Sequence, residues 1–327
     1  MANQNRNGGS VVGRLGKKAL TDYRIPLLAI LLFVVMSFAK GSFASSYNIY
    51  SIADAAAGYG IAAIGFTFIL LVGQLDISFG SVIALTSCVF MMMLKAEYNF
   101  ILALVTALVL GCVCGAITGF FVARFRLSPF IVSMTMQLVY KGVALTITNS
   151  TPVAVSDPTL TAIYKIKLFQ MIPITFIFFI VLAILVEFIL RRTQFGRNMY
   201  LVGGNINAAD NLGLKSSRYI WAAYVLQGLF AAIAGVVMMT RQFSASGNTA
   251  LQGPLNVIPM VIVGGTSMAG GKGGAIKTVW GVLLMNIVYN AMTMFSIPAP
   301  LQPFVKGLIL AIVIVIDKYM ERRHEKI

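Results

Sequence analysis

The chain has few charged residues and almost no side chains suited to acid–base or metal chemistry. Only 11% of its 327 residues are charged, whereas soluble domains carry about a quarter. Its one histidine, His324, lies in a charged C-terminal segment, and the sequence has no HExxH zinc motif and no GxSxG nucleophile motif. These absences argue against a soluble domain, a hydrolase and a metal enzyme.

Cysteine is scarce as well. The three cysteines lie inside apolar runs without metal-ligand spacing, so we interpret them as small packing residues: Cys88, Cys112 and Cys114. The same region has a stripe of glycines on one helix face: Gly111, Gly115 and Gly119. Such a stripe permits close helix packing, most often within one chain.

Apolar runs make up most of the chain. The sequence is 58% hydrophobic, and a membrane-spanning helix needs about 20 apolar residues. We therefore expect a polytopic membrane protein with no separate soluble catalytic domain. We predict ten membrane segments: Ile25–Ala39, Tyr50–Val72, Ile77–Leu94, Phe100–Val122, Leu127–Ile147, Leu168–Leu190, Tyr219–Thr240, Pro254–Ala269, Ala275–Phe295 and Pro300–Ile316.

The net charge of +15 would suit nucleic acid, but the basic residues cluster at the ends of the apolar runs, where they set membrane orientation. With the N-terminus inside, 18 of the 25 Lys and Arg residues fall on the inner side. This sorting favours a full crossing by the eighth segment. We expect a cytoplasmic tail at 1–24, a membrane domain at 25–317 and a cytoplasmic tail at 318–327, with no nucleic-acid partner.

Two connections are long. The external stretch 149–167 is rich in Pro, Ser and Thr, and the internal stretch 191–218 is too polar to span. In the internal stretch, Asn205 or Asn207 can cap a short helix that Gly213 would end. It is either a surface loop with one helical turn or a short helix that transmits force to a partner.

Asp76 is the only acid in a strongly apolar stretch, within "LLVGQLDISFGSVIALT". An intramembrane carboxylate is costly unless it is paired or hydrated. Three readings stay open: Asp76 or Ser78 caps a helix that restarts after a break, Asp76 lines or gates a cavity, or it binds a proton or ion.

The second interrupted stretch is "VIVGGTSMAGGKGGAIKTV", residues 261–279. Gly-broken hydrophobic segments are typical of substrate paths in transporters. The glycines do not form a nucleotide-binding P-loop, because Thr266 stands where Gly is needed and Gly273 where Ser or Thr is needed. Val72-Gly73 and Val263-Gly264 precede the two breaks, a weak sign of an internal repeat.

Four motifs together resemble a known family: "GQLDISFGSVIALT" (73–86), "TQFGRNMYLVGGNINAADNLGL" (193–214), "VIVGGTSMAGGKGGAIKTVWGVLL" (261–284) and "KGLILAIVIVID" (306–317). In this order and spacing they resemble the permease subunits of ribose-type sugar importers of the ATP-binding cassette class. The resemblance extends from about Ile25 to Asp317.

The resemblance implies an all-α integral membrane fold of about ten helices, similar to vitamin B12-type importer permeases, with broken helices near the centre. It implies a bacterial cytoplasmic membrane and three protein partners: a second permease, identical or paralogous, a cytoplasmic ATPase and an extracytoplasmic solute-binding protein. The chain itself would be no enzyme and bind no cofactor, because ATP is used by the partner ATPase.

The resemblance also implies roles for individual residues. The loop that couples to the ATPase matches Asn198–Leu214 and includes Gly203, Gly204, Asn205, Ala208, Ala209 and Gly213. The translocation path would be lined or shaped by Asp76, Ser78, Gly264, Gly265 and Thr266. From their positive charge and their predicted place on the outer side of the membrane alone, we expect three basic residues to attract acidic patches on the binding protein: Lys165, Lys167 and Arg241.

The sequence departs from the family at one place. Many sugar permeases have "ELDAIAAVVIGG" before the second break, where this chain reads "PLNVIPMVIVGG", with Pro254 and Asn256 replacing two acids. A monosaccharide or related furanose is the expected solute, and nucleosides and branched amino acids are alternatives. An ion- or proton-coupled transporter using Asp76 is the competing function, and a membrane-embedded enzyme is the weakest hypothesis.

Overall fold

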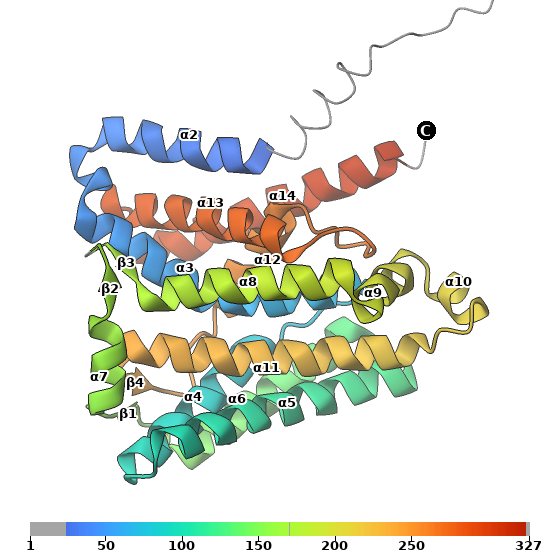
Figure 1. Cartoon of the computed structure of the whole chain (residues 1–327), viewed down its shortest axis with the longest axis horizontal. Coiled ribbons are helices and arrows are strands. Elements are labelled where there is room, and N and C mark those ends of the chain that lie inside the picture. The colour runs from blue at the N-terminus through green and yellow to red at the C-terminus, as the bar shows by residue number, and fades with distance from the viewer. Residues whose placement is uncertain (1–23, 170, 325–327) are drawn as a thin grey trace, which may run out of the picture.

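The computed structural model describes residues 24–169 and 171–324, mostly as helices that run side by side along one direction (Figure 1). The helices are α2 (Arg24–Ala39), η1 (Gly41–Ala44), α3 (Ser46–Leu71), α4 (Phe79–Lys95), α5 (Phe100–Phe125), α6 (Pro129–Ile147), α7 (Pro158–Lys165), α8 (Ile174–Arg192), α9 (Gln194–Gly204), α10 (Ile206–Asn211), α11 (Ser216–Gln242), α12 (Gly253–Gly264), α13 (Ala275–Met294), η2 (Ala299–Leu301) and α14 (Gln302–His324). Two short antiparallel pairs join β1 (Val153–Ala154) to β4 (Ser244–Ala245) and β2 (Lys167–Leu168) to β3 (Ile172–Pro173).

The helices follow the predicted apolar segments. Within the described residues, six helices are long and apolar enough to cross a membrane, and four shorter apolar helices correspond to the first, third, eighth and tenth segments. The tail predicted at 1–24 lies almost wholly outside the described residues. Helix α14 continues to His324, so the backbone of the predicted tail at 318–327 is helical through that residue.

Two predicted boundaries are wrong for local reasons. Helix α12 ends at Gly264 and not at Ala269, because Gly265 adopts a left-handed conformation with φ of 104°. The sixth segment begins as a helix at Ile174, because the β2–β3 hairpin occupies the preceding residues and Pro173 directly precedes the helix.

Helix α3 forms the centre of the bundle. Most of its side chains are buried, and it packs against α8, α11, α12 and α13. The predicted glycine stripe lies between α5 and α11, where a Cβ on Gly115 would stand 2.2 Å from the Tyr224 carbonyl oxygen and one on Gly111 2.4 Å from that of Gly228. The prediction of intramolecular packing by this stripe is therefore confirmed.

The bundle has two distinct ends, seen at the left and right of Figure 1. At the left, the α7 end, Val153 pairs with Ala245 between β1 and β4. At the right, the α10 end, the Gly271 amide donates to the Leu71 carbonyl oxygen at 3.0 Å. The chain thus passes from one end of the bundle to the other between Ala245 and Gly271.

Candidate coupling and translocation site

Helix α10 is a short helix with its own caps. The Asn205 side-chain oxygen accepts from the Ala208 amide at 3.0 Å, so Asn205 is the N-cap. After the helix, Gly213 has φ of 82°, and its amide donates to the Asp210 carbonyl at 2.9 Å. The Leu214 amide donates to the Ala209 carbonyl oxygen, which completes the C-terminal cap of α10. The short helix predicted from the sequence, with Gly213 at its end, is confirmed.

The predicted coupling residues fall into two groups. Gly204, Asn205, Ala208 and Gly213 are exposed, whereas the other two residues, Gly203 and Ala209, are buried. Only the exposed group can touch a partner protein. The resemblance did not point to Leu212, yet its side chain is 75% exposed at the C-cap of α10. Figure 1 shows α10 projecting beyond α9 and α11 at this end of the bundle.

Asp210 ties α10 to its neighbours. Its Oδ1 accepts from the Ser216 amide at 3.1 Å, at the start of α11. Its Oδ2 lies 3.8 Å from the Arg126 guanidinium after α5. The hydrogen bonds from Ser216, and to a smaller extent the charge of Arg126, lower the pKa of the Asp210 carboxyl below its ordinary value.

Gly203 lies at a close meeting of three main-chain segments. A Cβ on Gly203 would stand 1.7 Å from the Leu71 carbonyl oxygen at the end of α3 and 2.7 Å from the Gly271 nitrogen. A Cβ on Gly270 would stand 2.5 Å from the Gly203 oxygen and 3.0 Å from the Cα of Gly73. We call Leu71, Gly73, Gly203, Gly270 and Gly271 the glycine junction. It joins α9 to the two interrupted stretches, after α3 and after α12.

Side-chain hydrogen bonds reinforce this junction. The Tyr200 hydroxyl on α9 donates to the Gly273 carbonyl at 3.0 Å. A carboxylate oxygen of Glu187 on α8 accepts from the Ile276 amide at 3.2 Å, while the other binds Arg191. Helix α9 is thus bound to the loop between α12 and α13, and α8 is bound to the first turn of α13.

Asp76 lies in the first interruption, between α3 and α4. It is 3% exposed, and its Oδ1 accepts from both the amide and the hydroxyl of Ser78, at 2.7 and 2.6 Å. Ser78 is the N-cap of α4, but its own side chain makes no capping hydrogen bond. Nearby, the Tyr224 hydroxyl on α11 donates to the Leu75 carbonyl at 2.9 Å. Asp76 therefore stabilises the turn that leads into α4, but neither its side chain nor that of Ser78 forms a capping hydrogen bond with an amide inside the helix.

The N-terminal ends of α4 and α12 meet inside the bundle. A Cβ on Gly80 would stand 2.8 Å from the Ala250 carbonyl oxygen, which precedes α12, and 3.1 Å from the Pro254 ring. A Cβ on Gly253 would stand 3.5 Å from the Cα of Gly80. All of the helical residues in this contact are buried. The start of α4 therefore contacts the start of α12, whereas the two breaks noted in the sequence meet at the glycine junction.

The other three predicted path residues lie where α12 ends. A Cβ on Gly264 would stand 2.6 Å from the Lys277 carbonyl oxygen on α13, and Gly265 ends the helix. Thr266 is fully buried, and its Oγ1 has no hydrogen-bond partner within the described part of the chain. These residues hold α12 against α13, whereas Asp76 and Ser78 hold the turn before α4.

The basic residues that we expect to attract the solute-binding protein lie at the α7 end of the bundle. Arg241 forms an ion pair with Asp54 at 2.9 Å, and the Lys167 ammonium lies 4.4 Å from the centre of the Tyr50 ring. Lys165 is exposed in the last turn of α7. Arg241 and Lys167 therefore already have partners within the chain.

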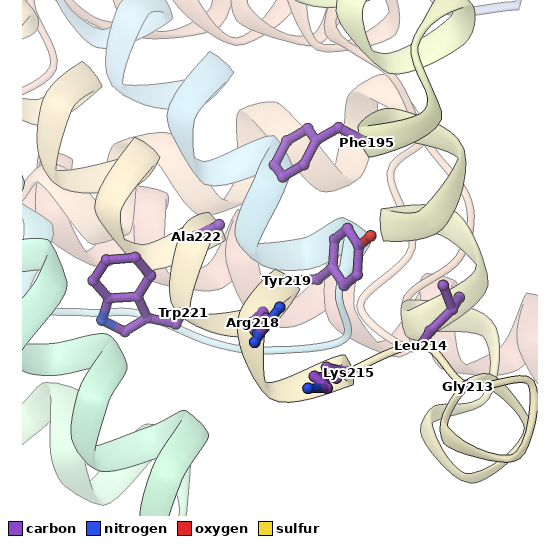
Figure 2. A pocket seen from close by; sticks show the side chains of 8 residues that line it. All are labelled: Phe195, Gly213, Leu214, Lys215, Arg218, Tyr219, Trp221 and Ala222. Carbon is purple, nitrogen blue, oxygen red and sulfur yellow. The ribbon is translucent and has the colours of Figure 1, made fainter.

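A pocket of about 620 Å³ lies beside α10 (Figure 2). It is lined by Phe195, Gly213, Leu214, Lys215, Arg218, Tyr219, Trp221 and Ala222. The Phe195 and Tyr219 ring centres are 5.9 Å apart, and the Trp221 indole nitrogen donates to the Ala116 carbonyl on α5 at 3.1 Å. No sequence pattern predicts this pocket, because its walls come from α9, from the residues between α10 and α11, and from the start of α11.

Comparison with known proteins places this architecture in a family. A family model described as "Branched-chain amino acid transport system / permease component" matches residues 48–314. The chain belongs to this permease family. It is therefore an integral membrane transport subunit and not itself an enzyme.

The permease has named relatives over most of its length. It is 29% identical to the ribose import permease protein of Escherichia coli (strain K12), over 92% of this chain and 95% of the relative. It is 30% identical to the ribose import permease protein of Bacillus subtilis (strain 168), over 90% of this chain and 92% of the relative. It is 29% identical to the L-arabinose ABC transporter permease protein of Azospirillum brasilense, over 92% of this chain and 88% of the relative. No solved structure gives a significant match.

Proposed function

We propose that this permease is the transmembrane subunit of an ATP-binding cassette importer for a monosaccharide. The relatives named for ribose and arabinose support this substrate class. The proposal includes ten crossings, a bundle of the vitamin B12-importer type and a bacterial cytoplasmic membrane with both termini inside. The working unit would hold two permeases, a cytoplasmic ATPase and an extracytoplasmic binding protein that delivers solute at the α7 end.

Coupling would start at α10. The ATPase would contact the exposed residues Gly204, Asn205, Ala208 and Gly213, while Gly203 and Ala209 would hold α9 and α10 in place. ATP binding would move α10, and the movement would reach α3 and the α12–α13 loop through the glycine junction. The observation that carries this proposal is the main-chain contact of Gly203 with Leu71 and Gly271. Closely packed segments move together, since they cannot deform independently.

The path residues would act by shaping the two broken segments. Asp76 and Ser78 fix the start of α4, and Gly264, Gly265 and Thr266 fix the end of α12. Displacement of these two segments by α9 would switch the bundle between outward and inward access. In this proposal the chain performs no covalent chemistry.

The test is solute uptake by proteoliposomes that contain the permease with its ATPase and binding protein. We expect ATP-dependent accumulation of radiolabelled ribose or arabinose, and no accumulation when the ATPase is omitted. Accumulation by the permease alone, driven by an ion gradient, would contradict the proposal and favour a secondary transporter.

A further inference from the structure

The pocket beside α10 contains two cations without partners. Neither Lys215 nor Arg218 has an ion-pair or hydrogen-bond partner for its side chain among the residues that the structure describes. They are three positions apart at the start of α11, so both side chains reach the same side of the helix. Figure 2 shows Arg218 between Tyr219 and Trp221, with Lys215 beside it.

These cations stand at the less favourable end of a helix. The N-terminus of an α-helix carries partial positive charge and favours anions. Helix α11 is 27 residues long and has no acidic residue in its first turn, and the carboxylate that accepts from the Ser216 amide there, that of Asp210, also pairs with Arg126. A bound anion would interact favourably with the two unpaired side chains, and Arg is well suited to bind phosphate through two parallel hydrogen bonds.

The rest of the pocket is apolar and continues onto an exposed apolar surface. Phe195, Leu214 and Trp221 line the wall, and the Trp221 side chain is 43% exposed. On α5, the exposed Phe120 lies one helical turn after Ala116, the acceptor of the Trp221 hydrogen bond, and so on the same side of the helix. A half-exposed tryptophan next to such a surface is typical of the membrane–water interface.

We propose that this pocket binds the headgroup of an anionic phospholipid, with the phosphate between Lys215 and Arg218 and the acyl chains along α5. Basic pockets between helices at the cytoplasmic side are a recurrent form of lipid recognition. An acidic segment of the ATPase would match the charge as well, but the apolar walls and the neighbouring exposed surface of α5 favour a lipid. The bound lipid would sit against α10 and influence how that helix responds to the ATPase.

The permease carries its own reporter, since it has only two tryptophans. The full chain with Trp280→Phe keeps Trp221 as the sole fluorophore and can be placed in nanodiscs of phosphatidylcholine. Brominated phosphatidylglycerol should quench Trp221 more than brominated phosphatidylcholine at the same mole fraction. Lys215→Gln with Arg218→Gln should lower the relative affinity for phosphatidylglycerol about 25-fold, at roughly fivefold for each basic residue.

Arg192→Gln is the matched control, because it removes a cation at the same end of the bundle outside the pocket. It should retain the preference for phosphatidylglycerol. Equal quenching by the two lipids, or a preference that survives the double substitution, would overturn the proposal. Loss of the preference for phosphatidylglycerol when the ATPase is added would also overturn the proposal, because the pocket would then hold a protein segment. This readout does not depend on the transported solute.

Discussion

The substitution Gly203→Ala tests whether the glycine junction needs a residue without a side chain. A Cβ at this position would stand 1.7 Å from the Leu71 oxygen, which is far inside contact distance, and 2.7 Å from the Gly271 nitrogen. Both atoms belong to the main chain, so no side chain can rotate away. The added methyl group would force α9 apart from α3 and break the hydrogen bond from Gly271 to Leu71.

The expected cost follows from these two effects. Overpacking a well-packed site costs about 1–3 kcal/mol, and a lost hydrogen bond costs about 0.5–1.5 kcal/mol. The better helix propensity of alanine returns up to about 1 kcal/mol. We expect a net loss of about 2 kcal/mol, which corresponds to a fall of roughly 3 °C in melting temperature for a chain of 327 residues.

Two measurements check this prediction. The melting temperature of the detergent-solubilised permease can be followed by fluorescence-detected size-exclusion chromatography, and coupling by solute-stimulated ATP hydrolysis in the reconstituted importer. We expect Gly203→Ala to lower the melting temperature and to abolish most of the solute-stimulated ATP hydrolysis.

Gly142→Ala provides the control at a helical glycine on α6, away from α10. A Cβ on Gly142 would meet no atom within 4 Å, so this variant should keep normal stability and coupling. If Gly203→Ala behaves like Gly142→Ala in both assays, the junction does not carry motion from α9 to α3 in the way we infer.

Three further predictions concern the same region and the first break. Ala208→Asp and Gly204→Trp change exposed positions, so both variants should fold but fail to retain the ATPase in a pull-down; normal association in both would count against docking at α10. Asp76→Asn should retain transport, because an amide oxygen still accepts from Ser78, whereas Asp76→Ala should reduce it; loss of transport in Asp76→Asn would instead support a proton or ion site. The pKa of Asp210 is lowered in the folded chain, so its stabilising contribution is present above the unfolded-state pKa and is lost as the pH falls through the folded-state value. The protection factor of the Ser216 amide, which compares its exchange rate with the intrinsic rate at the same pH, should therefore fall at acidic pH in the wild type and stay unchanged in Asp210→Asn.

The sequence determined the features that depend on neighbouring residues. The apolar runs predicted the long apolar helices, and Gly73 with Asp76 predicted the break after α3. Asn205 and Gly213 predicted both ends of α10. These predictions succeeded because hydrophobicity, capping and left-handed glycine conformations act within a few residues.

The tertiary structure decided the features that depend on distant segments. Gly203 and Ala208 match the same family motif, but only the packing of α9 on α3 shows that Gly203 is buried and Ala208 exposed. The contact of Leu71 with Gly271 joins residues 200 positions apart, and no local pattern specifies that distance. The sequence shows Lys215 and Arg218 only as two basic residues at the end of an apolar run. The packing of α9 beside α11 shows that both line a pocket. Each of these outcomes depends on which helices lie side by side, and that is fixed by the packing of the whole bundle.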